Sequence, residues 1–108
     1  MSEVSKLLFH GVPDHTAEAD LTTGPGAGKV WTVGPMWICN THSEARKLTL
    51  KIYIDASNTR ALMFNTTFAP NQPEIVHGLV IAHGHKIIAQ QETENAIEIT
   101  AYGLEGDV

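Results

Sequence analysis

The 108-residue chain has very little cysteine and no surplus of basic residues. Its single cysteine, Cys39, can form no intrachain disulfide, and zinc sites built from several cysteines are excluded as well. Seven Lys and Arg residues stand against twelve Asp and Glu residues, so the formal net charge is −5. Because the basic residues are scattered, they form no stripe that could follow a phosphate backbone. We therefore expect no direct nucleic-acid partner.

Long apolar runs and helical periodicity are also missing. No stretch approaches the roughly 20 apolar residues that a membrane-spanning helix needs, and the start of the chain does not have the pattern of a signal peptide. We therefore expect no membrane partner and synthesis in the cytoplasm. No window of ten residues repeats its apolar positions every 3.6 residues, so a substantial helix is not expected.

Residues 1–28 differ in composition from the rest of the chain. A short apolar piece, residues 4–9, is followed by a polar stretch that ends in a glycine-rich segment, residues 24–28. Such a stretch has too few apolar residues to form a core of its own. We predict an N-terminal arm with a first short strand over residues 1–28, and a β-sandwich domain over residues 29–108.

From residue 29 onward, short segments rich in β-branched and aromatic residues alternate with turn-forming residues, which is typical of strands. The clearest is 46–55, where four aliphatic side chains alternate with polar ones and share one face. The same criteria predict strands at residues 30–33, 36–40, 61–68, 74–81, 86–91 and 96–102. Strands without helices must bury their apolar faces against each other, so we predict an all-β fold. The specific form is an antiparallel β-sandwich, jelly-roll-like, with an extended N-terminal arm.

Histidines are the first candidates for chemistry, because the chain has six of them. His77, His83 and His85 could suggest a metal site like that of the cupin oxygenases, since residues two apart on a strand point the same way. Gly84, however, is better interpreted as the tip of a turn, where the two flanking histidines need not converge. The first carboxylate that could complete the set, Glu92, is also displaced from the cupin spacing. We therefore assign no metal and keep the three histidines as weak candidates.

Other candidate sites depend on burial. Cys39 lies in an apolar segment and is expected to be a small buried hydrophobe rather than a nucleophile. The glycine-rich segment before Lys29 lacks the spacing and the Ser or Thr of a phosphate-binding loop. Trp31 and Trp37 could stack on a sugar, although at least one of them should belong to the core. We therefore expect no catalytic residues, no cofactor and no enzyme activity.

Several segments together resemble the small β-sandwich proteins that bacteriophages build into their virions. The resemblance covers residues 29–104 and opens on a glycine-lysine entry into a strand. The matching segments are Gly28-Lys29-Val30, Ile38-Cys39-Asn40-Thr41, Leu48-Thr49-Leu50-Lys51-Ile52-Tyr53, His77-Gly78-Leu79-Val80-Ile81 with Gly84, and Ile97-Glu98-Ile99-Thr100-Ala101-Tyr102-Gly103. The sequence departs from the pattern at the turn, where His85 stands in place of an acidic residue.

The resemblance implies a structural role and no reaction. It favours a virion location and a capsid decoration (cement) protein, which stabilises the phage head by binding between capsid subunits. Its partners would be the major capsid protein and itself, as a homotrimer. Alternatives are a tail or fibre component, or a carbohydrate- or receptor-binding β-sandwich module. A cupin-like metal-dependent enzyme is a further alternative.

The apolar tip of the arm is the predicted partner-binding segment. Val4, Leu7, Leu8 and Phe9 are apolar enough to need a partner, while the polar residues that follow cannot provide one. Ordering this arm on an adjacent subunit or on the capsid would bury these side chains. The alternative is an arm that folds back onto its own domain.

Overall fold

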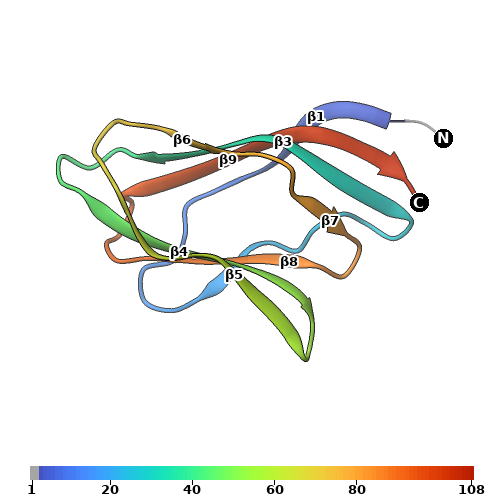
Figure 1. Ribbon diagram of the computed structural model, residues 1–108, viewed down its shortest axis with the longest axis horizontal. Coiled ribbons are helices and arrows are strands. Elements are labelled where there is room, and N and C mark those ends of the chain that lie inside the picture. Colours follow the sequence, from blue (N-terminus) through green and yellow to red (C-terminus); the bar gives the residue numbers. More distant parts are fainter. Residues whose placement is uncertain (1–2) are drawn as a thin grey trace.

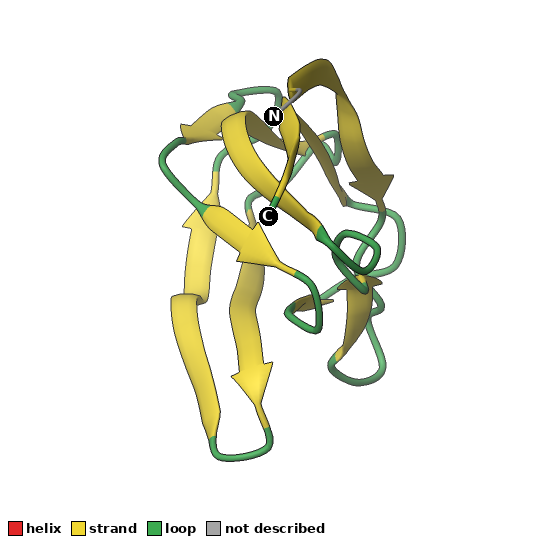
Figure 2. Cartoon of the chain, turned by 90° about the vertical axis from the view of Figure 1, so that its right-hand side faces the viewer, coloured by secondary structure: helices red, strands yellow, loops and turns green. Residues whose placement is uncertain are grey.

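The structure is a computed structural model that describes residues 3–108, so the first two residues of the expected arm lie outside it. The described chain is built from strands and loops (Figure 1, Figure 2). The strands are β1 (Glu3–Gly11), β2 (Ala19–Thr22), β3 (Lys29–Asn40), β4 (Arg46–Asp55), β5 (Asn58–Phe68), β6 (Glu74–Val76), β7 (Val80–Ala82), β8 (Lys86–Gln91) and β9 (Ile97–Asp107). Residues 3–108 contain no helix that is long and apolar enough to cross a membrane.

The strands form two antiparallel sheets that pack on each other as a β-sandwich (Figure 1). The five-stranded sheet has the order β1-β9-β3-β6, and β7 also pairs with β3. The four-stranded sheet has the order β2-β8-β4-β5. The predicted all-β antiparallel sandwich is therefore confirmed. Its jelly-roll form stays a prediction.

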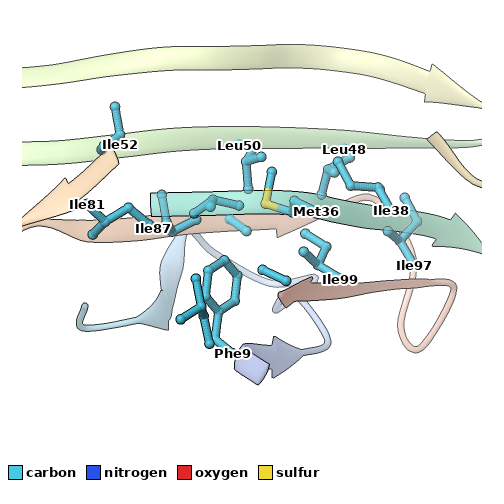
Figure 3. Close-up of a cluster of buried hydrophobic side chains, with 14 of the residues drawn as sticks. Phe9, Met36, Ile38, Leu48, Leu50, Ile52, Ile81, Ile87, Ile97 and Ile99 are labelled. Atoms are coloured by element: carbon cyan, nitrogen blue, oxygen red, sulfur yellow. The ribbon is translucent and has the colours of Figure 1, made fainter. Parts of the chain in front are cut away.

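Aliphatic side chains from both sheets fill the space between them (Figure 3). Met36, Ile38 and Ile99 of the five-stranded sheet are 0% exposed, as are Leu48 and Leu50 of the four-stranded sheet. The alternation that predicted strand 46–55 places these leucines on the inner face, because side chains at every second position share a face. The bounds of β4 agree with that prediction, and those of β8 agree equally well.

The segment Gly34-Pro35 does not end a strand, although the sequence predicted a break there. β3 runs through it, and the register with β9 shifts between Val33 and Met36, so two residues of β3 stand opposite Tyr102. This is a β-bulge, which accommodates a proline because the residue in a bulge does not need a ladder hydrogen bond. The bulge keeps both halves of β3 in one sheet.

The opposite error occurs at residues 74–81, which were predicted as one strand. The structure has two short strands there, β6 and β7, and both pair along the same edge of β3. Gly78 between them has a φ of 80°, which a residue in a continuous strand does not adopt. The neighbouring Leu79 carbonyl accepts a 2.8 Å hydrogen bond from the Val33 amide. The loop between β6 and β7 is therefore hydrogen-bonded to β3 next to its bulge.

The N-terminal segment does not extend away from the domain. β1 pairs with β9 along most of its length, and Leu8 and Phe9 are each 8% exposed. The Phe9 ring stacks on Trp31 with 6.1 Å between centroids. Within the described residues, the N-terminal segment is therefore folded back onto its own domain, which is the alternative given in the sequence analysis. The physical reason is that the core buries both side chains, and Phe9 is placed there against Trp31.

A buried amide fixes the polar chain that follows β1. Gln91, which is 1% exposed, donates from Nε2 to the Pro13 carbonyl at 2.6 Å. Its Oε1 accepts hydrogen bonds from the amides of Ala96 and Ile97, at 3.0 and 2.8 Å. One side chain therefore joins the end of β8, the turn before β9 and the segment after β1.

We expect Gln91→Leu to lower the free energy of unfolding by about 3 kcal/mol, because it leaves two amides and a carbonyl buried without partners. Urea denaturation followed by tryptophan fluorescence measures the change. The neighbouring half-buried Gln90 provides the control, since Gln90→Leu should change stability by less than about 0.5 kcal/mol. Equal effects of the two substitutions would contradict the role assigned to Gln91.

Candidate functional site

The three candidate histidines do not form a cluster with other metal ligands. His83 and His85 flank the turn between β7 and β8, and His77 is exposed after β6. The Nδ1 atom of His83 lies 3.0 Å from the Pro25 carbonyl oxygen, and that of His85 accepts a 3.2 Å hydrogen bond from the Ala82 amide. Across residues 3–108, no group of three or more His, Cys, Asp and Glu residues is arranged to hold a metal ion, and no pocket is found.

The two tryptophans lie on opposite sides of the five-stranded sheet. Trp31 is 7% exposed and belongs to the core, whereas Trp37 is 39% exposed on the outer face, as the prediction that at least one is core requires. A second aromatic side chain on the outer face, Tyr102, is 48% exposed. Cys39 also points outward and is half-buried, so the prediction that it is a buried core residue is wrong.

The outer face of the five-stranded sheet carries a group of large apolar and aromatic side chains. They come from five different strands and alternate with core residues such as Ile38, Ile81 and Ala101. We call this surface the apolar face, and it consists of Leu7, Trp37, Ile75, Val80, Tyr102 and Leu104, each between 38% and 54% exposed. Contiguous apolar patches of this kind mark contact sites more often than single exposed hydrophobic residues do.

The strand register brings these side chains together in rows. Leu7 stands opposite Tyr102, and Trp37 stands opposite Ile75. Leu104 and Val80 both flank Thr32, from opposite sides of β3. Side chains directly opposite each other have Cβ atoms about 5 Å apart, so the members of each of these two pairs are neighbours on the apolar face.

Polar residues on the apolar face are mostly small and uncharged. Thr100 pairs with Trp37 across the sheet, and its hydroxyl lies 2.7 Å from the Nδ1 atom of exposed His10. Glu98, which is exposed and stands opposite Cys39, places a carboxylate at one end of the surface. The apolar face is therefore a broad neutral area with an acidic residue at its end.

A second exposed apolar feature lies on the other sheet. β5 is an edge strand that pairs with β4 alone, and its side chains up to Thr67 are exposed apart from half-buried Met63. Leu62 is 38% exposed and Phe64 is 68% exposed. The turn end of the β4–β5 hairpin projects beyond the body of the sandwich (Figure 1). This hairpin surface was not predicted as a site.

The predicted partner-binding residues are split between the core and the surface. Leu8 and Phe9 are buried, whereas Val4 and Leu7 are 56% and 48% exposed. Leu7 belongs to the apolar face. Sequence reasoning named this exposed leucine and also Trp37, as a possible sugar-stacking residue, but it did not predict the other four members of the apolar face.

Two ion pairs join neighbouring strands of the five-stranded sheet. Lys6 of β1 forms a 2.8 Å ion pair with Glu105 of β9, and the hydrogen bond from Lys6 lowers the pKa of Glu105 below its ordinary value of 4.5. Lys29 likewise bonds to Asp107, which raises the pKa of Lys29. Both pairs join strands that are neighbours in the five-stranded sheet.

The lowered pKa of Glu105 gives stability a dependence on pH. A carboxyl with a lower pKa in the folded state stabilises the fold above its unfolded value of about 4.5, and this contribution is lost as pH falls through the folded value. We expect Glu105→Gln to be less stable than the wild type at pH 7, with the gap shrinking as the pH falls below 4.5. Thermal denaturation at pH 7 and at a series of pH values below 4.5 measures this gap. A gap that stays constant with pH would contradict the ion-pair explanation.

Comparison with known proteins adds no relative from which a role could be transferred. The chain matches no protein-family model, no curated protein and no solved structure at a significant level.

Proposed function

We propose that this chain is a virion structural protein that binds other protein subunits through its apolar face. The observation that carries the proposal is the set of six large, partly exposed side chains on the outer face of one sheet. Covering apolar surface is favourable by about 25 cal/mol per Å², so a face of this kind gains free energy when a partner excludes water from it. A β-sandwich supplies the rigid backbone that such a contact needs.

The specific role is that of a capsid decoration protein of a bacteriophage, with the major capsid protein and further copies of itself as partners. Support for this role comes from the sequence resemblance across residues 29–104 and from the apolar face, which offers exposed apolar contact area. In a symmetric shell, each weak contact is repeated many times, and a multimer that engages several sites gains avidity from linking them. The face therefore does not need high affinity in a single contact.

A test uses the pair of side chains that stand opposite each other on β1 and β9. We expect the double variant Leu7→Ser, Tyr102→Ser to bind head particles of the encoding phage at least tenfold more weakly in co-sedimentation. Both side chains are about half exposed, so the fold should survive, which circular dichroism checks. Val108→Ser is the control, because it removes a 91% exposed apolar side chain outside the apolar face. Unchanged binding of the double variant would contradict the proposal.

A second candidate function, carbohydrate binding, rests on Trp37 and Tyr102. Aromatic rings on one face of a sheet can stack on sugar rings, and these two side chains come from the adjacent strands β3 and β9. The structural role and the sugar-binding role predict different responses to a small ligand.

Titration with soluble oligosaccharides, followed by tryptophan fluorescence, separates the two candidates. The structural role predicts no saturable change. Sugar binding would quench Trp37, and Trp37→Phe would remove the response while leaving the signal of buried Trp31 in place. A saturable change that depends on Trp37 would favour the carbohydrate-binding module over the virion role.

A further inference from the structure

The loop between β3 and β4, residues 41–45, is built on a buried amide. It lies at the end of the sandwich opposite to the C-terminus (Figure 1). The side chain of Asn40, which is 0% exposed, donates from Nδ2 to the carbonyls of Glu44 and Phe68, both at 2.9 Å. Its Oδ1 accepts a 2.9 Å hydrogen bond from the amide of His42. The base of the loop is therefore fixed to the sandwich.

Both ring nitrogens of His42, which is half-buried, face hydrogen-bond donors. Nδ1 accepts a 3.1 Å hydrogen bond from the amide of Glu44. Nε2 lies 3.3 Å from Nη2 of the Arg46 guanidinium. A neutral imidazole has one nitrogen that can accept a hydrogen bond, and an imidazolium has none. The closed arrangement of the loop therefore requires a neutral ring.

We propose that the β3–β4 loop is a pH-sensitive device that opens when His42 takes up a proton. The added proton removes the acceptor for the Glu44 amide and places a second positive charge beside the Arg46 guanidinium. Both changes favour a ring that turns out into solvent. The open loop exposes the Arg46 side chain, which is 18% exposed in the closed one. Histidine is the side chain that ordinarily changes its charge between pH 5 and 8, so the switch acts in that range.

The charge in direct contact with the ring is the guanidinium. Glu44, in the loop itself, directs its carboxylate to Arg46 at 3.4 Å and is 72% exposed. Residues 68–71, which bond to the base of the loop, contain no ionisable side chain. In the loop before β9, Glu92 and Glu94 are exposed, and Glu92 accepts a 3.0 Å hydrogen bond from a backbone amide of β4. Nothing in these contacts replaces the acceptor that a protonated ring loses.

The histidines of the β7–β8 turn have different surroundings. His83 has Nδ1 at 3.0 Å from the carbonyl oxygen of Pro25, which accepts from a protonated ring as well as from a neutral one. His85 accepts from a backbone amide, but the charge that interacts with it is the carboxylate of Asp55, which attracts a protonated ring. Acid therefore disturbs the β3–β4 loop more than it disturbs this turn.

The inference goes beyond the proposed function, because the loop lies outside the apolar face. Exchange of amide protons with water, measured by NMR on the full chain, tests it. The quantity is the protection of the Glu44 amide, which is its exchange rate relative to that of an unstructured peptide at the same pH. We expect protection to fall about threefold or more between pH 7.5 and 5.5, where an unperturbed histidine goes from about one-tenth to about nine-tenths protonated.

His42→Asn should keep the protection constant over this range. An asparagine oxygen takes the place of Nδ1, accepts from the amide two residues further on as in an Asx-turn, and does not titrate. His77→Asn is the matched control, because it removes an exposed histidine after β6 and should leave the pH dependence in place. An equal fall in the wild type and in His42→Asn would overturn the proposal, since another group would then open the loop.

The wild type alone provides a second check that does not depend on a variant. The pH at which the Glu44 amide loses protection should coincide with the pH at which the NMR signals of the His42 ring shift. Protection that stays constant while the ring signals shift would overturn the proposal, because the ring would then take up its proton without opening the loop.

Discussion

The structure depends on one constraint: a strand that buries every second side chain turns the other side chains outward. In a two-sheet sandwich, each sheet is covered on its inner face only, by the other sheet. In the five-stranded sheet the inward residues, such as Ile38 and Ile99, are fully buried against the second sheet. The outward residues on the same strands include Trp37 and Tyr102, which have no layer above them. Large apolar side chains on an uncovered face cost free energy in water, so their presence is the feature that a function has to explain.

The fold class could be predicted because alternation is a local signal. Strand 46–55 shows its inward leucines directly in the sequence, and the structure confirms its bounds. Gly34-Pro35 and Gly78 were misjudged because glycine and proline act in turns and in bulges alike, and only the neighbouring strand decides which applies. β2, at residues 19–22, was missed since its pairing with β8 stabilises a segment that has little apolar character of its own.

The candidate surfaces were harder to predict than the fold. Which of Trp31 and Trp37 lies inside depends on register, and one residue of slip exchanges the two faces of a strand. The N-terminal segment was apolar enough to need a partner, but the sequence could not show that Leu8 and Phe9 are buried in the core of their own domain, with Phe9 stacked on Trp31. Exposure of Phe64 could not be predicted either, because it follows from the position of β5 at a sheet edge.

The thiol of Cys39 offers the most direct measurement of whether the apolar face is covered. It is the single thiol of the chain and points outward, opposite Glu98. We expect the rate at which a thiol reagent labels Cys39 to fall as the protein concentration rises, and the double variant Leu7→Ser, Tyr102→Ser to lose this dependence. A rate that is the same at all concentrations in the wild type would contradict the claim that copies of this chain cover the face.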